Sequence, residues 1–169
     1  MPAEEVFIAI GSNIGDSITI VEQSLDDISN INHCRLIDHS SLYCSEAVSD
    51  IDQAEYINAV ARIETTLEPL ALLLELQAIE HAYYRRRDSE LKWAPRTLDL
   101  DIILFANRTL NDSHLIIPHA EFHRRLFVLL PLLEISGDRY IPGHGSLQYL
   151  VEHAPKIAMQ KLDTSEHHG

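Results

Sequence analysis

The sequence is poor in cysteine and has no long apolar run. Its 169 residues include two cysteines, Cys34 and Cys44, too few for a disulfide-stapled scaffold. No apolar stretch is long enough to span a bilayer, and the first one, residues 6–10, follows two glutamates and lacks the form of a secretory leader. We therefore expect a cytoplasmic protein with reduced thiols and no membrane partner.

Basic residues are also scarce. The chain has 13 Lys and Arg against 26 Asp and Glu, a formal net charge of -13, which argues against a general binder of nucleic acid or of an anionic membrane. More than half of the basic residues nevertheless lie in a few clusters: Arg85-Arg86-Arg87, Lys92, Arg96 and Arg124-Arg125. This clustering indicates a local anion-binding site within an acidic protein.

Apolar residues are plentiful by contrast. They make up 46% of the chain, and charged residues make up 23%, a balance that excludes a disordered or fibrous chain. A length of 169 residues suits one domain with a substantial core. We expect a single domain over residues 1–163 and a disordered tail over residues 164–169.

The most informative stretch is residues 93–101, which read Trp-Ala-Pro-Arg-Thr-Leu-Asp-Leu-Asp before the apolar run of residues 102–105. We expect a buried strand that begins by Leu98. The period of two in a strand then turns Asp99 and Asp101 to one face, roughly 7 Å apart. Oxygen ligands without a nearby Cys or His cluster favour magnesium over zinc. Magnesium on two carboxylates takes its other ligands from water and phosphates, so the expected guest is a nucleoside triphosphate.

An alternative interpretation of these two aspartates is simply the solvated end of a strand. Like charges at this distance raise each other's pKa and repel. A fold keeps such a pair more readily when a cation compensates it, and this cost favours the metal interpretation.

Periodicity predicts alternating strands and helices. Runs rich in β-branched and aromatic residues predict strands over residues 6–10, 35–43, 56–65 and 98–105. Apolar residues at helical spacing predict helices over residues 18–28, 69–84, 126–132 and 147–151. The glycine-containing segment 11–16 is interpreted as a structural turn, because the Lys-Ser/Thr of a phosphate-binding loop is missing.

The order of these elements predicts the fold class. A βαββα order indicates an α+β fold, a ferredoxin-like α/β sandwich with a mainly antiparallel sheet and helices packed on one face. Gln77 and Glu80 lie three residues apart and share one side of the second helix. Taken alone they would be surface residues, and the arginines that follow would only complement the helix dipole.

Four segments in order, within residues 6–150, resemble the 6-hydroxymethyl-7,8-dihydropterin pyrophosphokinase family of folate biosynthesis. They are Ile8-Ala9-Ile10-Gly11-Ser12-Asn13, Tyr56-x-Asn58, Trp93-x-Pro95-Arg96-Thr97-Leu98-Asp99-Leu100-Asp101, and Pro118-His119 followed by Arg125-x-Phe127-Val128-Leu129-x-Pro131-Leu132. The resemblance implies a magnesium-dependent diphosphokinase that transfers a pyrophosphoryl unit from ATP to the hydroxymethyl group of the pterin and leaves AMP. It also implies a monomer that acts on small molecules.

The resemblance implies a role for each matching residue. The catalytic residues would be Arg85, Arg96, Asp99 and Asp101, with two magnesium ions on Asp99 and Asp101. The ATP site would comprise Gln77, Glu80, Arg87, Trp93, Arg96, Ile102, His119 and Arg125. The pterin site would comprise Ser45, Val48, Tyr56, Asn58, Trp93 and Phe127.

The sequence departs from the family pattern in two loops. It reads Ser45-Glu46-Ala47-Val48 where a threonine and prolines are usual, and Tyr84-Arg85-Arg86-Arg87 where Gly-Arg-x-Arg is common. The interval from these arginines to Trp93 is one residue longer, so Arg86 could exchange roles with either neighbour. No departure removes a predicted metal ligand.

Two alternative functions remain at this point. One is a manganese-dependent nucleotide-sugar glycosyltransferase, although the chain is short and has no separate nucleotide domain. The other is a non-catalytic ferredoxin-like regulatory module, which would have no need of paired metal ligands. Release of AMP from ATP separates the kinase from both.

Overall fold

The computed structural model describes residues 2–13, 16–45, 56–88 and 98–162, with the backbone alone for residues 85–88. The strands are β1 (Glu4–Ser12), β2 (Cys34–His39), β3 (Tyr43–Ser45), β4 (Tyr56–Thr65), β5 (Leu98–Phe105), β6 (Leu110–Asn111), β7 (Ile116–Ile117), β8 (Tyr140–Ile141), β9 (Gly145–Ser146) and β10 (Met159–Lys161). The helices are α1 (Ser17–Ser29), α2 (Pro69–Asp88), the short η1 (Phe122–Arg124), α3 (Leu126–Ser136) and α4 (Leu147–His153).

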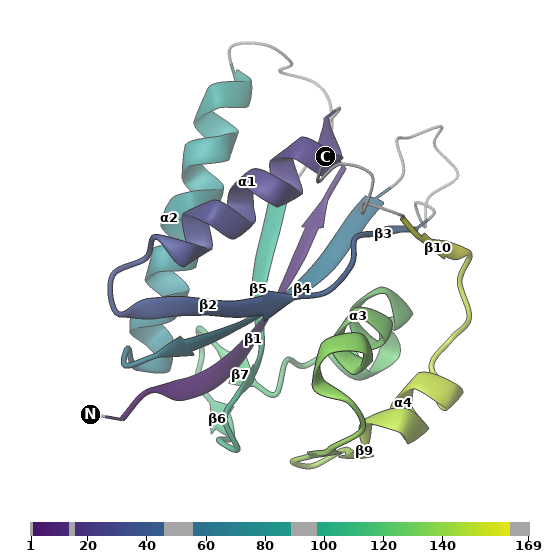
Figure 1. Cartoon of the computed structure of the whole chain (residues 1–169). Helices are drawn as coiled ribbons and strands as arrows, with labels where there is room; N and C mark the ends of the chain where they lie inside the picture. The colour runs from purple at the N-terminus through teal and green to yellow at the C-terminus, as the bar shows by residue number, and fades with distance from the viewer. Residues whose placement is uncertain (1, 14–15, 46–55, 89–97, 163–169) are drawn as a thin grey trace.

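The main sheet is antiparallel and has the order β10-β3-β4-β1-β5, with β2 also paired to β4 (Figure 1). The single strand expected over residues 35–43 is wrong, because two strands, β2 and β3, share β4 end to end. Ser40 separates them: its amide donates to Val60 O, and its hydroxyl accepts from Val60 N. The Ser40 hydroxyl thus accepts the hydrogen bond that a backbone carbonyl would otherwise accept, and the chain changes direction at this residue.

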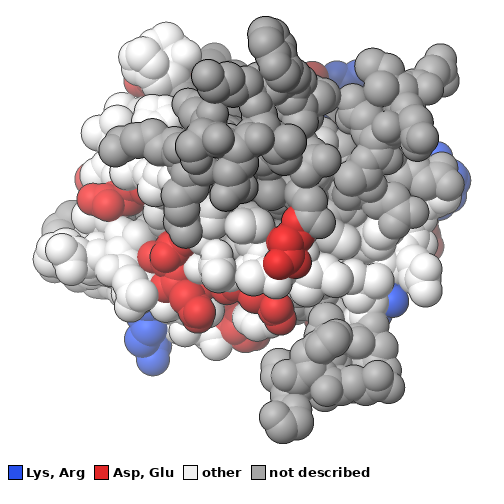
Figure 2. Space-filling view, turned by 90° about the horizontal axis from the view of Figure 1, so that it is seen from above, with Lys and Arg blue, Asp and Glu red and all other residues white. Residues whose placement is uncertain are grey.

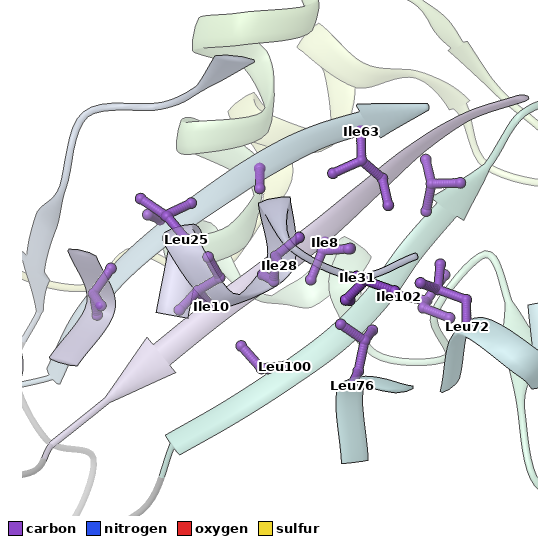
Figure 3. Packing of buried hydrophobic residues seen from close by; sticks show 14 of the residues in the cluster. Ile8, Ile10, Leu25, Ile28, Ile31, Ile63, Leu72, Leu76, Leu100 and Ile102 are labelled. Carbon is purple, nitrogen blue, oxygen red and sulfur yellow. The ribbon is translucent and has the colours of Figure 1, made fainter. Parts of the chain in front are cut away.

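One face of the sheet is covered by α1 and α2, which pack against it through a large apolar cluster (Figures 1 and 3). The α1 periodicity is confirmed at Val21, Leu25 and Ile28, which are buried, whereas Ile18 is 36% exposed. The expected apolar face of α2 is partly wrong: Leu72 and Leu76 are buried, whereas Leu70 and Leu74 are 40% and 67% exposed. Because nearly every residue in this turn is leucine, spacing alone did not fix which side of the helix meets the sheet.

The other face carries a second apolar core, to which α3, α4 and η1 contribute. The expectation that helices pack on one face is therefore wrong, although the α+β sandwich and its antiparallel sheet are confirmed. The run predicted as a helix over residues 126–132 is apolar on all sides, and α3 buries most of it. Pro131 lies inside this helix.

The first strand continues further than expected. Gly11 and Ser12 lie within β1, paired with Asn58 and Ile57 of β4, so the predicted turn at residue 11 is wrong. Asp16 takes the N-cap position of α1, but its side chain makes no capping hydrogen bond. β10, which no sequence pattern predicted, pairs with β3. The proposed tail, 164–169, lies outside the described residues.

Among the described residues, no helix combines the length and the apolar character needed to cross a bilayer.

Candidate active site

One row of residues crosses the sheet near the end of β1. Tyr43 pairs with Asn58, Asn58 with Gly11, and Gly11 with Asp99, so the row runs through β3, β4, β1 and β5. Val60, two residues after Asn58, belongs to the core under α3. Because alternate residues of a strand share a face, Asn58 and the rest of the row turn toward the α3 side.

Gly11 lies between the polar members of this row. A Cβ at Gly11 would lie 3.2 Å from Asn58 Oδ1, which is tighter than ordinary van der Waals contact. Asn58 and Asp99 are two strand spacings apart, about 10 Å. The strand therefore carries a glycine where the Asn58 amide oxygen approaches its backbone.

Asn58 is held in one orientation. Its Nδ2 donates to Ser45 Oγ at 2.8 Å, and both residues are buried, at 5% and 4% exposure. The amide oxygen is thereby left on the Gly11 side. Tyr56, half-buried, begins the same strand two residues earlier and shares this face. The structure thus brings together three of the predicted pterin residues, Ser45, Tyr56 and Asn58.

Phe127 lies in the first turn of α3 and packs, partly buried, against the core on this face. Arg125, the N-cap residue of α3, places its guanidinium carbon 6.0 Å from the centre of the Phe127 ring. Pro131 has no N–H, so Phe127 O receives no i→i−4 hydrogen bond from within this helix. Val48 and Trp93, the other predicted pterin residues, lie outside the described residues.

The alternation predicted for residues 98–101 is confirmed. Leu98 and Leu100 are buried, whereas Asp99 is exposed and Asp101 is half-buried. The backbone of β5 is also fixed from α2: Leu100 N donates to Glu80 Oε2 at 2.8 Å, and the Tyr84 hydroxyl donates to Leu98 O at 3.1 Å. The two aspartates therefore project from a strand that is hydrogen-bonded to its neighbours.

Negative charge gathers around this strand. Burial raises the pKa of Glu80 to about 7, and the charges of Asp99 and Asp101 add to the rise, while the Leu100 N–H opposes it. Figure 2, which shows the molecule from above, has several Asp and Glu side chains in the described part of this face as a whole, with Lys and Arg at its margins. A cation bound here would relieve this repulsion.

His119 and Arg125 border the carboxylates. His119 N donates to Ile103 O of β5 at 3.0 Å. Burial lowers the pKa of His119, the charge of Asp101 raises it and that of Arg125 lowers it again. The charges of a predicted metal ligand, Asp101, and of a predicted phosphate-binding residue, Arg125, therefore both act on the pKa of this imidazole.

The donors around Asp99 and Asp101 suit magnesium. The part of the chain that the structure describes holds no group of three or more His, Cys, Asp or Glu arranged for a metal. Two carboxylates with exposed or half-exposed oxygens fit an ion that completes its octahedron with water and phosphate oxygens.

The remaining predicted nucleotide residues lie mostly on α2. Gln77 is exposed and Glu80 half-buried. Ile102 is 1% exposed within the core under α1 and α2, so a nucleotide contact at this position falls to its backbone. Arg85 and Arg87 belong to the last turns of α2, where only the backbone is described, and Arg96 lies outside the described residues.

Glu134 of α3 was missed by sequence reasoning. Its carboxylate accepts hydrogen bonds from Ser41 N at 2.9 Å, from Ser41 Oγ at 3.0 Å and from the Tyr43 hydroxyl at 2.6 Å. These bonds fix the start of β3, which carries Ser45. No local pattern could have found this contact, because Glu134 is 91 residues from Tyr43 in sequence.

A sequence model described as 7,8-dihydro-6-hydroxymethylpterin-pyrophosphokinase (HPPK) matches residues 7–137. The chain belongs to this family. It is 41% identical over 157 residues to 2-amino-4-hydroxy-6-hydroxymethyldihydropteridine pyrophosphokinase of Haemophilus influenzae, covering 93% of this chain and 97% of the relative. It is 38% identical over 159 residues to the protein of the same name from Pseudomonas aeruginosa, covering 94% and 97%. These matches confirm the resemblance drawn from the four segments.

Solved structures of HPPK-DHPS proteins have a similar fold. A structure described as HPPK-DHPS in complex with substrates gives a TM-score of 0.70 at 14% identity, and it aligns with 90% of this chain. A Plasmodium falciparum HPPK-DHPS structure, the A437G variant with SDX-DHP, gives a TM-score of 0.71 at 14% identity. This chain spans 43% and 45% of those longer chains, and the likeness supports the HPPK fold.

Proposed function

We infer from the family membership that this chain is a pyrophosphokinase, which transfers a pyrophosphoryl group from ATP to the hydroxymethyl group of 6-hydroxymethyl-7,8-dihydropterin in folate biosynthesis. The family assignment selects this reaction over the glycosyltransferase and the regulatory module. The observation that carries it in the structure is the row that sets Asn58 and Asp99 on one face with Gly11 between them.

We propose that Asp99 and Asp101 hold two magnesium ions. Bound there, the ions would offset the charge of the ATP phosphates and help orient the attacking hydroxyl. The aspartates' own contribution is to project two carboxylates from adjacent same-face positions of a strand that is fixed on both sides. Supporting this role, the charges of Asp99 and Asp101 both raise the pKa of Glu80, so the carboxylates lie close together.

The phosphates would be bound by cationic residues from several elements. The charges of Asp101 and of Arg125, at the start of α3, both act on the pKa of His119 beside β5, so these groups lie close together. This proximity supports a role for His119 and Arg125 in binding the phosphates. Arg85, Arg87 and Arg96 follow from the family resemblance alone. Positive groups placed in advance around the transferring group stabilise the charge that shifts among the phosphates, and positioning supplies the rest.

The nucleotide itself would lie against the side of α2 that bears Gln77 and Glu80, with Ile102 contributing its backbone. The orientation of these residues toward the edge of β5 supports this placement, because Glu80 already contacts Leu100 there. Trp93 would border both substrates.

The pterin would occupy the space above Gly11. Its flat ring system needs aromatic faces and a directional polar partner. Tyr56 and Phe127 would supply faces, and Asn58 would present its amide oxygen because Ser45 occupies its NH₂ group. Val48 and Trp93 would complete the site. Since the pterin hydroxymethyl group must reach the phosphates, the short distance across Gly11 to Asp99 supports this arrangement.

We further propose that the enzyme acts as a cytoplasmic monomer. The balance of acidic over basic residues, with a formal net charge of -13, favours small-molecule substrates over nucleic acid.

The function is tested by incubating the purified protein with ATP, magnesium and 6-hydroxymethyl-7,8-dihydropterin and separating the nucleotides. We expect AMP, formed one for one with the pterin diphosphate, and no AMP when the pterin is omitted. Formation of ADP instead, or of no nucleotide product, would contradict pyrophosphoryl transfer. Repeating the assay with other pterins measures the tolerance of the site that contains Ser45.

A further inference from the structure

The strand that carries the two aspartates is at the edge of the sheet, within the part of the chain that the structure describes. On its inner side, Asp99 and Asp101 are paired with Gly11 and Ala9 of β1. In an antiparallel ladder, alternate residues turn their backbone groups to opposite sides. An edge strand therefore presents every second residue outward, and its position is less strongly determined than that of a central strand.

Two side chains of α2 meet these outward groups. The Tyr84 hydroxyl donates to Leu98 O at 3.1 Å, and Glu80 Oε2 accepts from Leu100 N at 2.8 Å. The two side chains are four residues apart, so they lie one above the other on the helix. Leu98 and Leu100 flank Asp99, which is thus bracketed by hydrogen bonds to α2 on one side of the strand and by β1 on the other.

We propose that Tyr84 is a positioning residue, which fixes the start of β5 and thereby aims the Asp99 carboxylate. The inference rests on the proposed role of Asp99 as a metal ligand. The Tyr84 hydroxyl bonds to the first residue of β5, two residues before Leu100, whose N–H donates to Glu80, so it is the contact nearer the start of the strand. The ring is half-buried against the same strand, and it directly precedes the cluster Arg85-Arg86-Arg87. One turn of α2 therefore orders the start of the carboxylate strand and leads into the arginines.

The neighbouring tyrosine provides a matched control. Tyr83 is also on α2, and its hydroxyl donates to Asp27 Oδ2 of α1 at 2.7 Å. Tyr83→Phe and Tyr84→Phe each remove one hydroxyl from the same helical turn and keep the ring. They differ in the partner that loses its hydrogen bond: a carboxylate on α1, or the backbone of β5.

The first measurement is amide hydrogen exchange on the protein without metal or nucleotide. Tyr84→Phe should speed exchange of the amides of residues 98–101 by about threefold to tenfold, because loosening an edge strand promotes local opening. Tyr83→Phe should leave these amides within about twofold of the original rate. Unchanged exchange in Tyr84→Phe, or an equal change in both variants, would overturn the proposal.

The second measurement separates positioning from general stability. In Tyr84→Phe, the magnesium concentration for half-maximal activity should rise about threefold to tenfold and kcat should fall, since small misplacements at a reacting centre are costly. The KM for the pterin, whose proposed contacts apart from Val48 and Trp93 lie on β3, β4 and α3, should change less than the magnesium requirement. A fall in thermal stability with an unchanged magnesium requirement would show a purely structural tyrosine.

The two proposals fail in different ways. If the original protein releases no AMP, the proposed function is wrong, but the exchange measurement still decides whether Tyr84 orders β5. If the original protein releases AMP and Tyr84→Phe behaves like Tyr83→Phe in both measurements, the positioning role is wrong and the function stands.

Discussion

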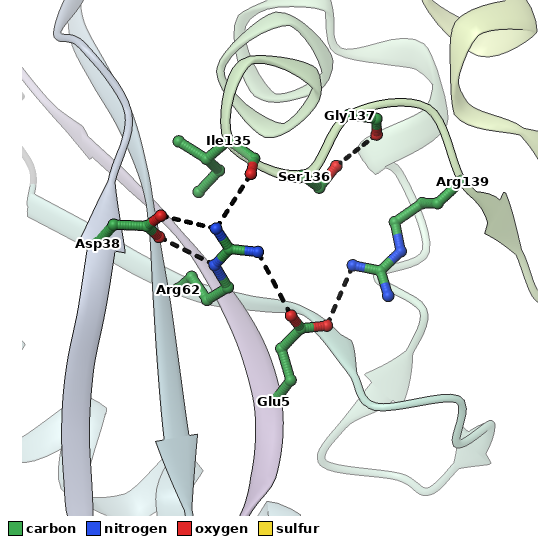
Figure 4. Close-up of polar contacts among 7 residues, drawn as sticks. All are labelled: Glu5, Asp38, Arg62, Ile135, Ser136, Gly137 and Arg139. Carbon is green, nitrogen blue, oxygen red and sulfur yellow. Dashed lines mark hydrogen bonds and ion pairs between the residues drawn. The ribbon is translucent and has the colours of Figure 1, made fainter.

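The two ends of the sheet face under α3 treat charge in opposite ways. Toward the start of β1, Arg62 donates two hydrogen bonds to the Asp38 carboxylate, at 2.9 and 2.6 Å, and a third to Ile135 O (Figure 4). Its Nη1 also forms an ion pair with Glu5 Oε2 at 3.5 Å. Arg139 reaches Glu5 from beyond α3 at 3.1 Å. Toward the end of β1, Asp99 and Asp101 lie beside Glu80 and raise its pKa.

This difference separates structural charge from functional charge. In the first region each acid faces an arginine, and the pairs tie β1, β2 and β4 to the end of α3. In the second region the charges of Asp99 and Asp101 raise the pKa of Glu80, and like charges this close repel one another. The comparison predicts that substitutions in the first region change stability, and those in the second change activity.

The largest expected effect is that of Asp101→Asn. The proposed ligand loses its charge with little change in shape, so pyrophosphoryl transfer should fall by about 10³-fold, equivalent to about 4 kcal/mol in the barrier. Without metal, the free energy of unfolding should stay equal or rise, because one repulsive charge is gone. AMP release and urea unfolding measure the two quantities. Near-normal turnover in this variant would show that the metal assignment is wrong.

The next effect is that of Arg62→Ala, which removes the paired charge at the other end. Asp38 and Glu5 lose a shared partner, and we expect unfolding to become easier by about 1–2 kcal/mol, a modest value because the side chains are partly exposed. Chemical denaturation measures it. The KM values and kcat should stay within about twofold. A tenfold loss of kcat with unchanged stability would remove the distinction between the two regions.

A smaller effect concerns the pH dependence of stability. The pKa of Glu80 is raised from 4.5 to about 7, chiefly by burial and then by Asp99 and Asp101. As pH rises from 4.5 to 7 the unfolded chain loses this proton first, so the free energy of unfolding of the metal-free protein should fall over this window.

The matched variant for this prediction is Glu80→Gln, whose side-chain oxygen can still accept from Leu100 N. In this variant the part of the decline that Glu80 causes should be absent. We expect that part to be less than about 1 kcal/mol, because the Glu80 side chain is only half-buried. Urea unfolding at several pH values, with and without magnesium, measures it. A decline of the same size in both proteins would mean that another group titrates.

The smallest effect is that of Arg35→Ala. Arg35 and Glu64 form a pair at 3.4 Å across β2 and β4, but their side chains are 73% and 41% exposed. We expect less than about 0.5 kcal/mol change in the free energy of unfolding. If the free energy of unfolding falls as much as in Arg62→Ala, ion pairs between strands, and not the bond from Arg62 to Ile135 O of α3, would account for the stabilising effect of Arg62.

Local patterns predicted the strands and helices where one face is clearly apolar. The bounds of β4 are those expected, and the alternation that turns Asp99 and Asp101 to one face is confirmed. The division of residues 35–43 into β2 and β3 was not predictable in this way, because it depends on Ser40 bonding to Val60, which is 20 residues distant. β10 likewise forms only because β3 offers it an edge.

The site shows the same limit. The residues of the pterin and metal sites could be chosen from sequence by resemblance, but their arrangement depends on register. The sequence predicts Gly11 as a turn residue, and only its pairing with Asn58 and Asp99 reveals that it lies between them on the sheet. No sequence pattern marks Glu134 or Tyr84 as a residue that positions the site, because acidic and aromatic residues are common on helices.

Pro131 has a consequence for the ring that is proposed to stack on the pterin. In an ordinary helix, Phe127 O would accept a hydrogen bond from the N–H of residue 131, and rotation of the first turn would break that bond. With proline at position 131, the turn that carries Phe127 can tilt toward or away from the sheet without this loss. The turn that carries Phe127 is thus held by one backbone hydrogen bond fewer, while the bonds from Val128 N and Leu129 N to Arg125 O remain.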